Sequence, residues 1–206
     1  MNLLKLFPKP NEIREGLRVS GQFYLFNMNA GEKVDPSVQA AWRSFSVYWL
    51  TAPFGLLSGW IFDRVYIAAY GVDKPLYFAY AVTGSIASTF LAMFLSYKLS
   101  RMEHVEANFP RYVTAINWGS LWVLIISIPL IGLVQSGWLS HDQIAYLGTG
   151  LFLISLVYGW FFAWRALQLE VTVAMGVAIL ASAIPGIVSD FIGLRLYGVA
   201  RPFFEQ

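Results

Sequence analysis

The sequence contains no cysteine and few charged residues, and both absences narrow what the protein can be. Without cysteine there can be no disulfide framework, no thiol nucleophile and no cysteine-ligated metal or iron–sulfur site. Only 13% of the 206 residues are charged, about half the share typical of a soluble domain, whereas 57% are hydrophobic. The net charge of +2 does not favour nucleic-acid binding. This composition predicts an integral membrane protein whose first partner is the lipid bilayer.

Five stretches of the chain are long and apolar enough to cross a hydrocarbon core about 30 Å thick, which takes about 20 helical residues. Because every backbone amide must be satisfied internally in lipid, these stretches are expected to be helices. The predicted fold is therefore an all-α transmembrane bundle of about five spans. In chain order the spans are Ser44 to Phe62, Leu76 to Tyr97, Val113 to Val134, Ile144 to Trp164 and Val171 to Ile192.

The predicted spans divide the chain into three parts. Residues 1–43 form a cytoplasmic or interfacial segment, residues 44–192 the transmembrane domain, and residues 193–206 a short tail on the other side. Asp35 and Pro36 predict a helix start, because Asp caps free amides and Pro at the first helical position sacrifices no hydrogen bond. This helix is expected to run on into the first span.

Positive charge lies mainly on one side of the predicted spans. Ten of the 14 Lys and Arg residues fall in residues 1–43 and in the loops after the second and fourth spans, and four fall in the other loops and the tail. Because positive loops stay in the cytoplasm, the N-terminus is expected inside and the C-terminus outside. The short loops and the absence of a predicted signal peptide favour a bacterial inner membrane.

Each odd-numbered span carries one proline, at Pro53, Pro129 and Pro185. A proline opens one backbone hydrogen bond, and kinked helices at membrane depth can build an ion or substrate site in a transporter. The alternative is that these prolines only serve packing, because proline is common in membrane helices.

Two polar residues complete this candidate ion or substrate site. Asp190 is the acidic residue near the outer end of the last span, and Asn117 is a polar residue of the third. Each has a simpler alternative role. Asp190 can be hydrated at headgroup level, and Asn117 can make an interhelical hydrogen bond.

Small residues recur every four positions along the last span, at Ala174, Ala178, Ser182 and Gly186. A ridge of small side chains lets another helix approach closely, so these residues are predicted to form a helix-packing face. The helix that they contact can belong to this chain, to a second copy in a homo-oligomer or to a partner membrane protein.

The sequence lacks four common motifs of enzymes and nucleotide-binding proteins. It has no Walker loop, HExxH, GxSxG or dinucleotide-binding motif. His104 stands between Glu103 and Glu106, but the only other histidine, His141, falls on the opposite side of the predicted membrane. Because a metal site needs at least three converging ligands, we expect no metal, no cofactor and no enzymatic activity.

Five spans, a cytoplasmic N-terminal segment and a short outer tail resemble the layout of the Yip1-type membrane domain, found in eukaryotic Golgi trafficking proteins and in bacterial proteins. Of the family's Asp-Leu-Tyr-Gly-Pro string only Leu196-Tyr197-Gly198 occurs, and it stands in the tail. The segments from Phe26 to Phe45 and from Ala115 to Trp118 are also similar to small bacterial inner-membrane proteins. Neither resemblance implies a catalytic or binding residue.

The sequence predicts an accessory or scaffold protein that contacts partner proteins or lipid through its packing faces and its positively charged N-terminal segment. The first alternative is a small transporter or channel built on the three proline-bearing helices. An enzyme acting on lipid ranks third.

Overall fold

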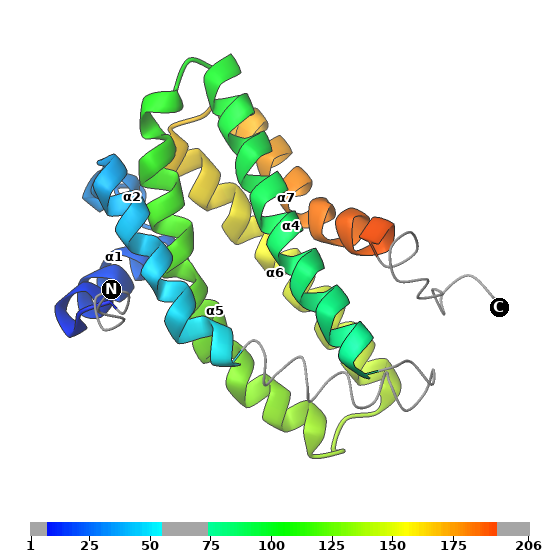
Figure 1. The fold of residues 1–206 in the computed structure, drawn as a ribbon. Coiled ribbons are helices and arrows are strands. Elements are labelled where there is room, and N and C mark those ends of the chain that lie inside the picture. Colours follow the sequence, from blue (N-terminus) through cyan, green and yellow to red (C-terminus); the bar gives the residue numbers. More distant parts are fainter. Residues whose placement is uncertain (1–7, 55–73, 193–206) are drawn as a thin grey trace.

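The computed structural model describes residues 8–54 and 74–192, and in these ranges the chain is all helical, as predicted. Short 3-10 turns connect some of the helices, and residues 48–54 continue the second helix. The six α-helices given labels in Figure 1 are α1 (Pro10–Tyr24), α2 (Val38–Ser44), α4 (Lys74–Met102), α5 (Phe109–Gln135), α6 (His141–Leu167) and α7 (Val171–Ile192).

Four of these helices are long and apolar enough to cross a membrane. They overlap the second to fifth predicted spans. The first predicted span is helical as far as residue 54, and residues 55–62 lie outside the described ranges. The four candidate spans are Val82–Met102, Glu106–Val134, Asp142–Leu167 and Val171–Val188.

Local side chains set the ends of α6. The Ser140 hydroxyl accepts a hydrogen bond from the Gln143 amide at 3.3 Å, and the Gln143 side chain accepts one from the Ser140 amide at 2.8 Å. This reciprocal capping box satisfies amides that the first turn leaves free. At the other end Gln168 adopts a left-handed conformation with a φ of 60°, which stops the helix.

The start of α2 differs from the prediction. Ser37, not Asp35, caps the helix, because the Ser37 hydroxyl accepts a hydrogen bond from the Ala40 amide at 3.1 Å. The Asp35 carboxylate instead accepts one from the Ser37 amide at 2.8 Å. Asp35 thus closes a turn that precedes the helix, and the predicted start was wrong by two residues.

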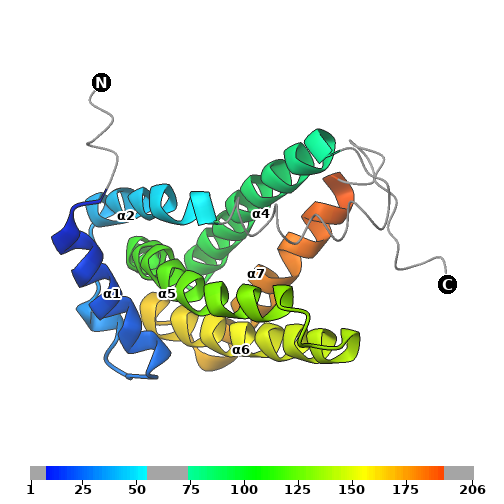
Figure 2. The same ribbon diagram turned by 90° about the horizontal axis from the view of Figure 1, so that it is seen from below.

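The four long helices alternate in direction and run side by side (Figure 1). α6 packs against both α5 and α7, and α7 packs against α4. The helices are close together at the upper end of Figure 1 and farther apart at the lower end. Outside this bundle, α2 runs along α5, and α1 crosses α5 and α6 (Figure 2).

One half of the molecule holds the larger buried core, and we call it the packed half. It comprises residues 8–47 together with residues 109–122 of α5 and 158–169 of α6. Its core brings three parts of the chain together, with Phe23 fully buried among aromatic and small residues of the two long helices. Examples are Tyr112, Ala115, Phe161, Phe162 and Ala166.

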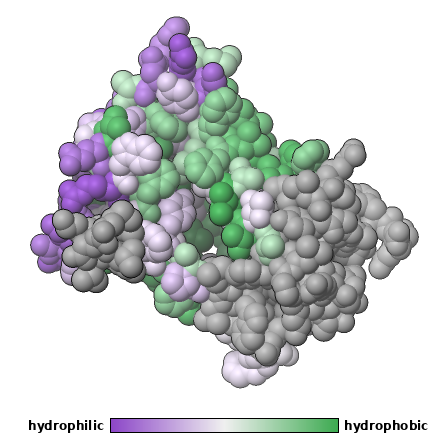
Figure 3. All heavy atoms as spheres, in the orientation of Figure 1, coloured by the Kyte–Doolittle hydropathy of each residue, from purple (hydrophilic) through white to green (hydrophobic). Residues whose placement is uncertain are grey.

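The opposite half is the apolar half, formed by residues 123–135 of α5, 141–157 of α6 and 179–191 of α7. Many large apolar side chains of these stretches are exposed. In the orientation of Figure 3 the polar surface lies over the upper and left parts of the molecule, and the middle is apolar. The exposed side chains include Val123, Ile126, Ile128, Leu153, Ile154, Ile179 and Ile187.

Candidate functional site: the N-terminal platform and its recess

Residues 10–47 fold into a platform on the packed half, and its first element, α1, was not predicted from the sequence. The sequence does contain a pattern typical of a helix here: a proline stands at its start, and the residues that the structure buries follow at a helical spacing. Gly16 lets α1 approach α5 closely, because an added Cβ would lie 2.1 Å from the Trp118 ring. The buried face consists of Gly16, Val19, Ser20 and Phe23.

Hydrogen bonds hold α1 across α5 and α6. The Trp122 indole donates to the Leu17 carbonyl at 3.1 Å, and the Tyr24 hydroxyl donates to the Gly119 carbonyl at 3.0 Å. The Tyr158 hydroxyl of α6 donates to the Tyr24 carbonyl at 3.3 Å. Burial, and to a lesser degree the neighbouring Tyr158, raises the pKa of Tyr24 to about 12.

The segment from Leu25 to Ser37, which we call the strap, leads from α1 to α2 and is fixed to α6. The Phe26 ring stacks on the Tyr158 ring with centroids 5.2 Å apart. Farther along, an added Cβ on Gly31 would lie 1.9 Å from the Arg165 carbonyl oxygen. Only glycine permits this approach, so Gly31 allows the strap to lie directly against α6.

Asn117, a predicted site residue, lies at the junction between α5 and the helix that begins at α2. It is fully buried, and its amide nitrogen donates to the Ser44 hydroxyl at 2.8 Å. Its amide oxygen accepts a hydrogen bond from the Tyr48 hydroxyl at 3.2 Å. Both ends of the amide are therefore used in joining helices, as in the simpler of its two predicted roles.

The three predicted prolines share no cavity in the described part of the structure. Pro53, Pro129 and Pro185 are all exposed, and none lines any of the three cavities described for residues 8–54 and 74–192. Asp190 belongs to α7, but its side chain lies outside the described part of the structure.

The predicted packing ridge of α7 changes its surroundings along its length. Ala174 and Ala178 are buried, and Ala178 faces Gly159 of α6, where an added Cβ would lie 3.6 Å from the Ala178 methyl group. Ser182 is half-buried and Gly186 is exposed. The ridge is thus buried in its first half and becomes more exposed toward its end.

A recess of about 410 Å³ opens in the platform, and sequence reasoning did not identify it. α1, the strap and α2 form its walls, and α5 forms its floor. Its volume falls within the range of about 300 to 1,000 Å³ that is usual for ligand pockets. The side chains at its edge are mainly polar or charged, and include Glu12, Glu15, Lys33, Asp35, Gln39 and Arg43.

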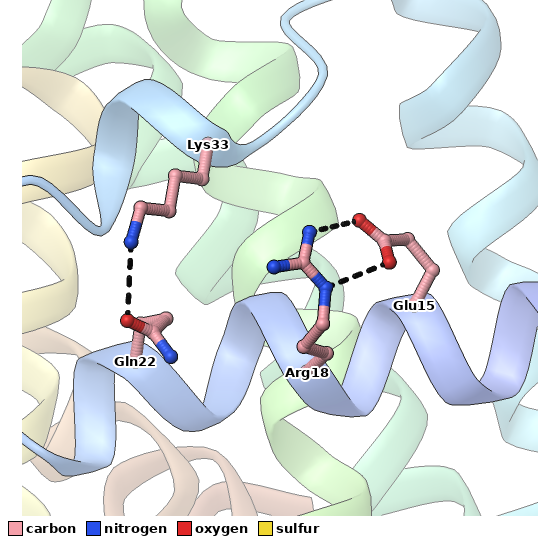
Figure 4. Close-up of polar contacts among 4 residues, drawn as sticks. All are labelled: Glu15, Arg18, Gln22 and Lys33. Atoms are coloured by element: carbon pink, nitrogen blue, oxygen red, sulfur yellow. Dashed lines mark hydrogen bonds and ion pairs between the residues drawn. The ribbon is translucent and has the colours of Figure 1, made fainter.

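Most charges around the recess are paired or hydrogen-bonded (Figure 4). Arg18 makes two hydrogen bonds to Glu15, at 2.6 and 2.9 Å, and this contact lowers the pKa of the Glu15 carboxyl. Lys33 reaches from the strap and donates to the Gln22 side chain of α1 at 3.2 Å. Glu12 of α1 pairs with Arg43 of α2. Two of these contacts join different walls of the recess, Lys33 of the strap to α1 and Glu12 of α1 to α2.

Ser20 lines the recess and differs from its polar neighbours. Only 1% of its surface is exposed, and its hydroxyl has no hydrogen-bond partner among the described residues. A buried hydroxyl without a partner costs free energy unless water or a bound group satisfies it. Among the described residues no general base is hydrogen-bonded to Ser20, and activation of a serine hydroxyl requires such a base.

Comparison of the chain with protein-family models, with curated proteins and with solved structures gave no match. The resemblance to the Yip1-type layout therefore stays an expectation. Among the residues that the structure describes, no group of three or more His, Asp or Glu side chains is placed to hold a metal ion.

Proposed function

We propose that the chain is an accessory or scaffold protein of a membrane, without enzymatic activity, that spans the bilayer five times with its N-terminus in the cytoplasm. In this proposal the apolar half lies in lipid, and the platform lies at the cytoplasmic surface. The recess in the platform receives a polar segment of a partner protein. A bacterial inner membrane is the proposed location.

The observation that carries the proposal is the position of the platform. α1 is fixed against the middle of α5 by the hydrogen bonds of Trp122 and Tyr24. On its outer side Arg14 and Arg18 are exposed. Because exposed arginines are costly in hydrocarbon, this level of the bundle is best placed in the headgroup region or in water.

The recess supports partner binding over a purely structural platform. The Ser20 hydroxyl is buried beside the recess and has no partner among the described residues, so one donor there remains uncommitted. Polar and charged groups at the edge give specificity to such an interface. The transporter alternative finds less support, since the three prolines are exposed and line none of the described cavities.

The test is site-specific photo-crosslinking in native membranes. A photoreactive amino acid replaces Gln39, which is exposed at the recess, or Tyr146, which is exposed in the apolar half. We expect a discrete protein adduct from position 39 and not from position 146. The adduct should weaken when Ser20→Ala removes the free hydroxyl and persist with Ser155→Ala in the apolar half.

Lipid adducts alone at position 39, or a protein adduct that Ser20→Ala leaves unchanged, would contradict the recess as a contact site. The absence of cysteine allows a separate test of orientation with single cysteine variants. Glu32→Cys in the platform should react with an impermeant reagent only from the cytoplasmic side, and Asp142→Cys at the start of α6 only from the other side.

A further inference from the structure

A second cavity, distinct from the recess, lies between α5 and α6 and extends into the apolar half. Its volume is about 540 Å³. Seven residues of α5 between Ile116 and Leu130 and seven residues of α6 between Leu151 and Phe162 line it. Tyr24 of α1 also contributes to its lining, at the end that adjoins the platform.

This second cavity, which we call the groove, is apolar although several hydroxyl groups line it. Ser120 donates to the Asn117 carbonyl at 2.7 Å, Ser127 to the Val123 carbonyl at 2.7 Å, and Ser155 to the Phe152 carbonyl at 2.7 Å. Each hydroxyl is therefore satisfied within its own helix. Because apolar cavities do not hold water well, the groove needs an apolar occupant.

The dimensions of the groove match one leaflet of a bilayer. At 1.5 Å per residue, the lining stretches of α5 and α6 extend about 21 and 16 Å. Half of a hydrocarbon core about 30 Å thick is about 15 Å. Tyr24 and Tyr158 stand at one end, where amphipathic rings mark the level of the headgroups.

We propose that this groove holds one acyl chain of a phospholipid from the leaflet on the platform side. The inference rests on the membrane placement in the proposed function. Exposed Ile126 and Ile154 line the groove and continue the apolar surface that faces lipid, so a chain enters sideways from the bilayer. α5 and α6 pack directly against each other, so the groove lies between two helices that are already in contact.

The groove selects the chain and not the headgroup. None of the described residues that line it carries a charge. Its selectivity arises from dispersion contacts with the apolar side chains that line it, such as Val123, Ile126 and Ile154. Phosphatidylcholine and phosphatidylglycerol with the same chains should therefore bind equally well.

The experiment uses the full chain in nanodiscs that contain a phospholipid with a diazirine in the middle of one chain. After illumination, mass spectrometry locates the adducts. We expect them to concentrate on the groove residues, well above the level at equally exposed residues of α7 such as Ile179. The enrichment should be the same with a choline or a glycerol headgroup.

Two variants that fill the groove, each with a matched control, test whether the groove binds the chain. Ser155→Phe and Ser127→Phe fill the groove from opposite walls, and we expect either to abolish the enrichment. Leu153→Phe and Ile128→Phe place the same ring on exposed positions outside the groove and should preserve it. If one of the two filling variants does not fold, the other one still tests whether the groove binds the chain.

Adducts spread in proportion to exposed area would overturn the inference and show only a general lipid shell. Enrichment that depends on the headgroup would overturn the selection of the chain. Either result leaves the membrane placement standing. Failure of that placement would appear differently, as a lack of adducts on every exposed apolar residue, α7 included.

Discussion

The two halves of α5 are both apolar, yet their surroundings are opposite. From Tyr112 to Leu121 most side chains are buried against the platform and α6, whereas from Val123 to Leu133 many are exposed. The difference arises outside α5, because α1 and α2 pack on it and the contacts that α1 makes through Gly16, Leu17 and Tyr24 lie between Trp118 and Trp122. Apolar composition thus serves a protein core in one half and contact with lipid in the other.

This difference in packing predicts different responses to the same substitution. Added volume should destabilise the packed half, where close contacts leave no room. In the apolar half, lipid can adapt to an added methyl group. Four measurements test this contrast, from the largest expected effect to the smallest.

Gly16→Ala should lower the free energy of unfolding by roughly 3 kcal/mol, because its Cβ would lie 2.1 Å from the buried Trp118 ring. Gly148→Ala is the matched change in α6, where nothing lies within 4 Å of the added atom. It should be neutral or stabilising by about 0.5 to 1 kcal/mol. Unfolding in mild detergent, followed by tryptophan fluorescence, measures both. Equal effects would contradict the contrast.

Asn117→Ala should cost about 2 kcal/mol, because it removes the donor to the Ser44 hydroxyl and the acceptor of the Tyr48 hydroxyl in a buried junction. Ser127→Ala removes a hydroxyl that bonds only within its own helix and should change stability by less than about 0.5 kcal/mol. The same unfolding assay applies. A small effect of Asn117→Ala would show that the junction does not hold the platform.

Alkaline pH should loosen the platform before it affects the apolar half. The folded pKa of Tyr24, about 12, lies above its unfolded value of 10.0, so its stabilising contribution is complete below pH 10 and is lost as the pH rises to 12. Deprotonation also removes the donor to the Gly119 carbonyl. Protease sensitivity of residues 8–47 between pH 9 and about 12 measures the loss. Tyr24→Phe should remove this part of the pH dependence.

Glu12→Gln should have the smallest effect, about 0.5 kcal/mol or less. It removes the charge that pairs with Arg43, whose side chain is 56% exposed, and exposed ion pairs contribute little. Gln keeps an acceptor for the Lys9 amide, so the start of α1 is preserved. Thermal unfolding at low and high salt measures the change. A loss above 2 kcal/mol would mean that the pair anchors α2 to α1.

Much of the fold was predictable because it depends on local physics. Long apolar runs such as Val171 to Ile192 must be helical in lipid, whatever their neighbours. α1 was not predicted because it contains no long apolar run. Two of the residues on its buried face, Gly16 and Ser20, are small and not strongly apolar. Their role becomes clear only when Trp118 lies opposite. The recess could not be predicted, because its walls come from three segments far apart in the chain.

By itself the sequence determined the helical class and the four long apolar helices, since an apolar backbone in lipid has to satisfy its own hydrogen bonds. Only the tertiary structure decided which apolar residues face protein and which face outward. That choice depends on contacts such as Phe23 on Phe162, between residues more than a hundred positions apart. Residues that face protein and residues that face outward have the same hydropathy, and only the packing of the folded chain distinguishes them.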